Sequence, residues 1–302
     1  MLRQMQPEHL ISRFSEIRTM GRTFITERKS QNLSPKTIIF YQGEIDLFLR
    51  WLEKRQILAL KDLQAGDIRE YLTDLGNRRN KGGIHASYRA IKAFLRFYEF
   101  EYEPENWKNP INKVRLQSQK PEPLKGISID QLTKFLEVIE GKHALRDRAI
   151  FSGLASSGLR VSEFLALNLE DVDVNTGTIR VRHGKGDKPR IAFLGKEARS
   201  ALKRYLKIHP KEVPAVWTND EGERMTISGL RYSLVKYSKL AGIGKISLHD
   251  FRRCFALSCY RKGVDIFSIS QLLGHSTVEV TKRYIAINEE DLQQAHLRGD
   301  PL

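Results

Sequence analysis

The stretch from Asp171 to Leu194, DVDVNTGTIRVRHGKGDKPRIAFL, decides the fold class of this chain. Apolar and polar residues alternate along it, with turn residues at Asn175–Gly177 and again at Gly184–Asp187. Alternation interrupted by two short turns predicts a small antiparallel sheet. Nearly all the remaining sequence has its apolar residues at helical spacing. We therefore expect a mainly α-helical protein with one small antiparallel sheet.

The N-terminal third of the chain shows only helical patterns. Residues 34–55, SPKTIIFYQGEIDLFLRWLEKR, begin with Ser34 as a helix cap and Pro35 at the first helical position. Two further amphipathic segments follow, GDIREYLTDLGNR and HASYRAIKAFLRFYEF. Residues 7–102 have helical patterns throughout, so these three segments and the residues before Ser34 predict a bundle of four helices within residues 1–107.

Residues 108–126, KNPINKVRLQSQKPEPLKG, differ from both flanking regions. They contain three prolines, five basic residues and one acid, without periodicity. This composition predicts an extended basic linker, which could lie along a nucleic-acid backbone or simply be solvated. A second domain then covers residues 127–302. Its first helix is expected after Ser128, which forms a capping-box pattern with Gln131.

The net charge narrows the choice of partner. The chain has 51 Lys and Arg against 36 Asp and Glu, a formal charge of +15, and a pI near 9.8. A protein this basic is expected to bind a polyanion, with nucleic acid favoured over an anionic membrane surface. No signal peptide or membrane span is visible, and Cys254 and Cys259 are expected to be reduced thiols. We therefore expect a cytoplasmic protein.

Several polar residues occur where a purely structural role is harder to explain. Arg160 follows an apolar helix and is one turn from Glu163, so a structural ion pair is one interpretation. His249 and Arg252 share a helix face and could both bind one phosphate. Lys185 lies between glycines at a hairpin turn, where lysines are usually solvated. Each residue alone carries little weight.

His275 and Tyr284 complete the pattern. Taken singly, either residue would more often pack or cap a helix. Together with the others they suggest attack of a tyrosine hydroxyl on a phosphodiester. Arginines would stabilise the developing charge, and a lysine could protonate the leaving oxygen. No carboxylate cluster for magnesium and no P-loop is present in the sequence, so we expect no metal, ATP or other cofactor.

The motifs SGLRVSE, HGKGDKPR, LHDFRRCFA and LLGHSTVEVTKRY occur in an order that resembles the tyrosine recombinases of the phage-integrase and Xer type. The resemblance is firm from residue 127 to about 290, and residues 33–52 are similar to the SAM-like core-binding domain. It implies a DNA-binding domain over 1–107 and a mixed α/β catalytic domain over 127–302. Arg253 departs from the family, which usually has histidine there. The resemblance implies that Arg160 and Arg252 bind the phosphate, that Lys185 is the general acid and that Tyr284 is the nucleophile. It also assigns His249 and His275 to the site, with Glu163 as a supporting acid.

The resemblance also implies how such a protein acts. It would clamp a double-stranded recombination site, form a covalent 3′-phosphotyrosine, and exchange strands through a Holliday junction as a homo-tetramer, with a dimer on each site. An accessory protein, and a C-terminal tail (288–302) that docks on a neighbouring protomer, belong to the same picture. Two alternatives stay open: a catalytically silent DNA-binding protein, or an enzyme like type IB topoisomerases or telomere resolvases. The expected DNA contacts are Arg79, Lys81, Arg89, Lys92, Lys113 and Arg115.

Overall fold

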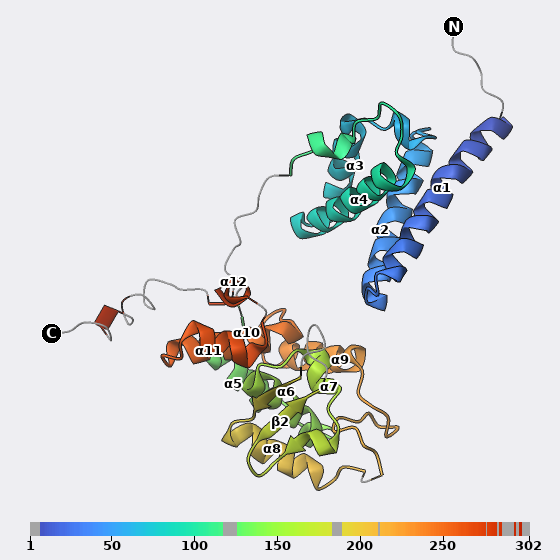
Figure 1. Cartoon of the computed structure of the whole chain (residues 1–302). Coiled ribbons are helices and arrows are strands. Elements are labelled where there is room, and N and C mark those ends of the chain that lie inside the picture. Colours follow the sequence, from blue (N-terminus) through green and yellow to red (C-terminus); the bar gives the residue numbers. More distant parts are fainter. Residues whose placement is uncertain are drawn as a thin grey trace. The chain divides into compact units, whose positions relative to one another are not determined.

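The structure, a computed structural model, divides into two compact units, residues 1–118 and 119–302 (Figure 1). Each unit has its own core and is considered by itself. The residues that it describes are 7–116, 126–182, 189–210, 212–275, 277–282, 284–285, 293 and 296–297.

The first unit is a helical bundle around one apolar core. Ser34 caps the second helix as predicted, because its hydroxyl accepts a hydrogen bond of 3.2 Å from the amide of Thr37. Phe24, Phe48 and Phe94 come from three different helices and are fully buried. The helices of this unit are α1 (Pro7–Ser30), α2 (Pro35–Lys54), η1 (Leu60–Asp62), α3 (Ala65–Gly76), α4 (Lys81–Tyr102) and η2 (Pro110–Lys113), where η marks a 3₁₀ helix.

The first part of the predicted linker is packed rather than extended. Pro110–Lys113 forms η2, and Ile111 and Val114 are buried in the core of the first unit. Asn109 fixes this segment by donating hydrogen bonds to the Leu95 carbonyl and to the Glu99 carboxylate. The prediction of an extended segment from residue 108 is therefore wrong for 108–116. Two apolar residues three apart were too weak a periodicity to reveal the packing.

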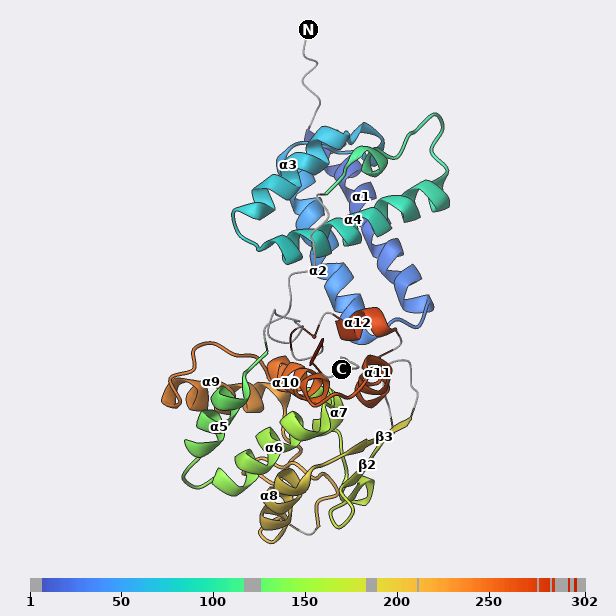
Figure 2. The same cartoon turned by 90° about the vertical axis from the view of Figure 1, so that its left-hand side faces the viewer.

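The second unit packs helices against one face of a three-stranded antiparallel sheet (Figure 2). The strand order is β1-β2-β3, and Ile179 pairs with Val172 on one side and Ala192 on the other. Ile179, Val181 and Ala192 face a core shared with α6 and α8. The elements are α5 (Ile129–Glu137), α6 (Ala144–Ser157), α7 (Val161–Leu165), η3 (Leu169–Asp171), β1 (Val172–Asp173), β2 (Thr178–Val181), β3 (Arg190–Phe193), α8 (Lys196–Leu206), α9 (Ile227–Leu240), α10 (Leu248–Arg261), α11 (Ile266–Leu273) and α12 (Val278–Lys282).

Helices α10, α11 and α12 lie at one end of the second unit (Figures 1 and 2), where residues of α10, of α11 and of the segment after α12 form a smaller apolar cluster. Ile269 and Leu273 from α11 pack in it against Tyr284 and Ile285, which follow α12. Helix α11 ends at Gly274, whose φ of +65° is the left-handed conformation that favours glycine. The turn at Gly274 leads directly into His275.

The predicted fold class is confirmed. The protein is mainly helical, with a small antiparallel sheet formed by the stretch that predicted it. The capping box of Ser128 and Gln131 is also present, with both of its hydrogen bonds at 3.1 Å. None of the helices in the described residues combines the length and apolar character needed to cross a bilayer.

Candidate active site

Arg160 and Glu163 form the ion pair that their spacing allowed. Arg160 precedes α7. The Glu163 carboxylate accepts one hydrogen bond from the Arg160 backbone amide (2.9 Å) and one from Arg160 Nη1 (2.8 Å). Phe164 ties helix α7 to the core. Its ring stacks on Trp217, and its backbone carbonyl accepts a hydrogen bond of 2.8 Å from the Trp217 indole nitrogen. The start of α7, and Arg160 with it, is therefore fixed to the main core.

A second arginine, which the sequence analysis did not single out, binds the same carboxylate. Arg190 begins β3 and donates from Nη1 (3.1 Å) and Nη2 (2.7 Å) to the two oxygens of Glu163. The Glu163 side chain is only 5 % exposed. Burial works to raise the pKa of Glu163, but the hydrogen bonds from Arg190 and Arg160 outweigh it and lower that pKa. Glu163 is therefore a carboxylate shared by two guanidiniums.

Arg252 is almost completely buried beside this pair. It is 1 % exposed and donates to the carbonyls of Gly158 (2.8 Å) and Leu273 (2.7 Å). Its Nε has no hydrogen-bond partner within the described part of the chain. Burial and the neighbouring Arg160 guanidinium lower its pKa to about 10, so it stays charged at neutral pH. A buried cation with a free donor suits an oxyanion ligand.

Tyr284 points its hydroxyl at a histidine. Its Oη lies 2.6 Å from Nε2 of His249, and the tyrosine is 8 % exposed. Burial, followed by the charges of Arg253 and Arg252, lowers the pKa of His249 to about 4. His249 is therefore neutral at pH 7, and a neutral imidazole nitrogen can accept the hydroxyl proton.

His275 also lies against Tyr284. The two ring centroids are 5.1 Å apart, and His275 Nδ1 lies 2.8 Å from the Thr281 hydroxyl. Burial and the charges of Arg252 and Arg160 lower the pKa of His275 to about 3, so this histidine is neutral as well. Thr281 is fully buried, and its carbonyl accepts a hydrogen bond from the Tyr284 backbone amide. Thr281 therefore links His275 to Tyr284.

The structure thus brings five of the six predicted catalytic residues together, and Glu163 binds one of them, Arg160. The five are Arg160, His249, Arg252, His275 and Tyr284. Lys185 lies outside the described residues, as does the predicted hairpin turn that carries it. Arg253, the departure from the family pattern, forms an ion pair of 2.7 Å with Asp250 on the same helix. The group offers a hydroxyl with a proton acceptor, one buried guanidinium (Arg252) and two partly buried ones (Arg160 and Arg190). Such a group can drive nucleophilic attack on an anionic ester.

The predicted DNA contacts in the first unit differ in their availability. Arg79 is engaged with the buried Glu44 carboxylate at 2.8 and 2.9 Å, and Lys92 lies over the Tyr88 ring. Lys113 and Arg115 are exposed at and after η2. On α4, helical spacing puts Lys81, Arg89 and Lys92 on one stripe, to which the structure adds His85 and Arg96.

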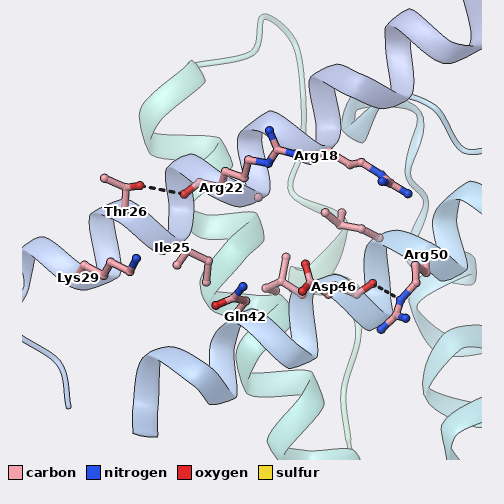
Figure 3. Close-up of a pocket in the computed structure, with 11 residues that line it drawn as sticks. Arg18, Arg22, Ile25, Thr26, Lys29, Gln42, Asp46 and Arg50 are labelled. Carbon is pink, nitrogen blue, oxygen red and sulfur yellow. Dashed lines mark hydrogen bonds between the residues drawn. The ribbon is translucent and has the colours of Figure 1, made fainter. Parts of the chain in front are cut away.

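A second basic surface of the first unit is a hollow between α1 and α2 with a volume of about 540 Å³ (Figure 3). Arg18, Arg22 and Lys29 line it from α1, and Arg50 lines it from α2 beside Asp46. Arg18 is bound to Glu53 at 2.9 Å. The sequence analysis did not identify this surface, because its cations come from two separate helices.

Comparison with protein families and relatives agrees with this geometry. The model for the phage integrase family matches residues 125–291, and the model for its N-terminal SAM-like domain matches residues 22–103. The tyrosine recombinase XerC of Leptospira interrogans is 30 % identical over 281 residues, which are 90 % of this chain and 89 % of the relative. The tyrosine recombinase XerD of Pasteurella multocida is 29 % identical, over 90 % and 94 %.

Solved structures show the same fold. The XerH site-specific recombinase bound to palindromic difH substrate, in a post-cleavage complex, has a TM-score of 0.73 at 23 % identity. That match covers 90 % of this chain and 83 % of the other. A lambda integrase dimer bound to a COC′ core site has a TM-score of 0.75 at 16 % identity, covering 88 % and 94 %.

Proposed function

Since the chain belongs to the phage integrase family, we propose that it is a site-specific tyrosine recombinase that breaks and rejoins duplex DNA. The observation that carries the proposal is the Tyr284 hydroxyl, 2.6 Å from a neutral His249 and beside Arg160 and Arg252. Its relatives are named tyrosine recombinases, and related folds have been solved on recombination sites.

The proposed first step is attack of Tyr284 Oη on the phosphorus of one DNA strand. His249 Nε2 takes the hydroxyl proton as the bond between oxygen and phosphorus forms. The bond to the 5′-oxygen breaks, and Lys185 donates a proton to that leaving oxygen. The products are a 3′-phosphotyrosine and a free 5′-hydroxyl. One phosphoester replaces another, so rejoining requires no ATP.

The remaining polar side chains stabilise the charge on the phosphate and hold the catalytic groups in position. Arg160 and Arg252 bind the non-bridging oxygens, where negative charge grows in the transition state. His275, whose ring lies against Tyr284, binds the same phosphate, and Glu163 holds Arg160. The protons and charges of this step all come from side chains of the protein.

The rest of the proposal concerns assembly. The helical unit within 1–107 would bind DNA through its basic surfaces, and the segment before residue 127 would connect it to the catalytic unit. Four protomers in the cytoplasm would exchange strands between two sites through a Holliday junction, with a dimer on each site. The tail (288–302), which lies almost entirely outside the described residues, would dock on a neighbour.

A nicked suicide duplex tests the proposal. The protein first selects binding sites from a random pool of duplexes, and a nick is then placed so that the cleaved end diffuses away. Denaturing gels and mass spectrometry should find a covalent adduct on Tyr284. Tyr284→Phe should bind the DNA without forming it. Tyr232→Phe, at a residue that is 78 % exposed on α9, is the matched control and should react normally.

Other outcomes would support the alternatives. Selective binding without an adduct in the unsubstituted protein would favour a catalytically silent DNA-binding protein. Relaxation of supercoiled plasmids that lack any selected site would favour an enzyme like type IB topoisomerases.

A further inference from the structure

We propose that Arg190 is a positioning residue of this site, which fixes the guanidinium of Arg160 through the shared carboxylate of Glu163. The inference rests on the proposed function, because it assigns Arg190 a role in the same cleavage step. Arg190 is the last residue of the motif HGKGDKPR, five residues after Lys185, and its position there indicates no role of its own.

The first support is the geometry at Glu163. Oε1 accepts from Arg160 Nη1 (2.8 Å) and Arg190 Nη1 (3.1 Å). Oε2 accepts from the Arg160 amide (2.9 Å) and Arg190 Nη2 (2.7 Å). Each oxygen is therefore held by both arginines. Without Arg190, the carboxylate keeps only the partners on Arg160 and is free to turn with it.

The second support is the contact between Arg190 and the turn at Gly274. A Cβ at residue 274 would lie 2.7 Å from Arg190 Nε and 2.8 Å from its Cζ. Glycine therefore lets the Arg190 side chain approach the backbone at this turn. The Gly274 carbonyl accepts a hydrogen bond of 3.3 Å from Arg160 Nη2, and His275 is the next residue. Arg190 is thus linked to Arg160 through Glu163 and also contacts Gly274, which binds Arg160 and precedes His275.

The third support is a comparison of the two ends of the hairpin that joins β2 to β3. Arg182 follows β2 and pairs with Asp171 (2.6 Å) and Glu170 (2.7 Å), and its side chain is 53 % exposed. Arg190 begins β3 and is 15 % exposed. Both arginines form ion pairs at the facing ends of β2 and β3, but only Arg190 reaches Glu163 and the turn before His275. Arg182→Gln is therefore a matched control.

The experiment compares single-turnover cleavage of the suicide duplex at saturating protein. Arg190→Gln should cleave about 10- to 100-fold more slowly, the loss typical of a partner that orients a reactive group. Its Kd for the DNA should be unchanged, because Arg190 does not bind the substrate. Arg190→Lys, which keeps the charge but not the two-pronged contact, should be intermediate. Arg182→Gln should cleave like the unsubstituted protein.

A modified substrate separates positioning of Arg160 from other effects. A methylphosphonate at the cleaved position replaces one charged oxygen with a methyl group, so the reaction depends less on the arginines. On this substrate the defect of Arg190→Gln should shrink, as should that of Arg160→Gln. A defect that instead shrinks on a 5′-phosphorothiolate, whose leaving group needs no acid, would place the effect at Lys185 and overturn the inference.

Folding is controlled separately. If Arg190→Gln melts below the assay temperature, Arg190→Lys, which keeps the charge, replaces it and should show the same methylphosphonate response. Equal cleavage rates for Arg190→Gln and the unsubstituted protein, or an equal loss in Arg182→Gln, would refute the role of Arg190. No adduct in the unsubstituted protein would overturn the proposed function itself, and this inference with it.

Discussion

Replacing Glu163 with glutamine should destabilise the second unit by about 3 kcal/mol, an amount that follows from its contacts. The carboxylate accepts four hydrogen bonds, three of them from guanidinium groups. A glutamine keeps one acceptor oxygen and turns its NH₂ group toward two donors, so two of the four bonds are lost. Each bond to a charged group contributes about 1.5–3 kcal/mol. The Arg160 side chain is 25 % exposed, and water there favours the lower end of that range.

The assay uses the positions of the tryptophans. Trp217 belongs to the core of the second unit, whereas Trp51 and Trp107 belong to the first. In a background with Trp51→Phe and Trp107→Phe, fluorescence reports urea unfolding of the second unit alone. Glu163→Gln should lower its free energy of unfolding at pH 7.5 and lower its melting temperature by about 6–12 °C. Unfolding of the first unit, followed through Trp51 and Trp107 in a Trp217→Phe background, should not change.

The pH dependence tests the same argument through its sign. The pKa of Glu163 is lowered in the folded protein, so its contribution is complete above the unfolded pKa of 4.5. That contribution is lost as the pH falls through the folded value. The difference between the unsubstituted protein and Glu163→Gln should therefore shrink as the pH falls below 4.5. A difference that stays constant over this range, or that is absent at pH 7.5, would refute the reasoning.

Three further predictions follow from the site and the basic surfaces. Lys185→Ala should slow cleavage, and a 5′-phosphorothiolate substrate should restore the rate; if the rate stays low, Lys185 is not the acid. DNA affinity, measured by fluorescence anisotropy, should fall by about 10³ between 50 and 200 mM salt if six phosphates are neutralised, and a flat response would contradict phosphate binding. The pKa values of His249 and His275 are about 4 and about 3 in the folded protein, below the unfolded value of 6.5. Between the folded and unfolded pKa values, the unfolded chain therefore binds more protons than the folded protein. Stability in urea should therefore fall as the pH drops from 6.5 toward 4, and His249→Gln should lessen that fall; the same pH dependence in both proteins would argue against a buried neutral His249.

Sequence spacing alone paired only residues that are near each other in the chain, whereas the grouping of His275 and Tyr284 with them came from the resemblance to tyrosine recombinases. Glu163 is one helical turn from Arg160, and His249 is one turn from Arg252, so periodicity alone paired them. Arg190 was missed because it lies 27 residues from Glu163, and only the folded sheet brings the two together. The strands themselves were predictable, since their alternation is local.

The same limit applies to the first unit and the linker. Four helices could be predicted from their own apolar stripes. The packing of Ile111 and Val114 could not, because it depends on Asn109 reaching Leu95 and Glu99 on α4. The hollow between α1 and α2 is likewise a property of two helices together, and neither sequence alone indicates it.

The charges around Tyr284 favour the proposed transition state over the ground state. Three guanidiniums, those of Arg160, Arg190 and Arg252, and the one carboxylate of Glu163 leave a net charge of +2, because both histidines are neutral. A phosphodiester carries one negative charge, and attack by a tyrosine oxygen adds a second on its non-bridging oxygens. Groups that match the second charge accelerate the reaction rather than only binding the DNA.

The same cations also prepare the nucleophile. Burial, followed by the charges of Arg253 and Arg252, lowers the pKa of His249 to about 4, so its ring is neutral at pH 7 and its Nε2, 2.6 Å from the Tyr284 hydroxyl, can accept the proton. An arrangement with fewer arginines would bind the charge less well and would also leave the histidine closer to protonation. Charge stabilisation and proton acceptance therefore depend on one set of residues, whose geometry Glu163 and Arg190 maintain.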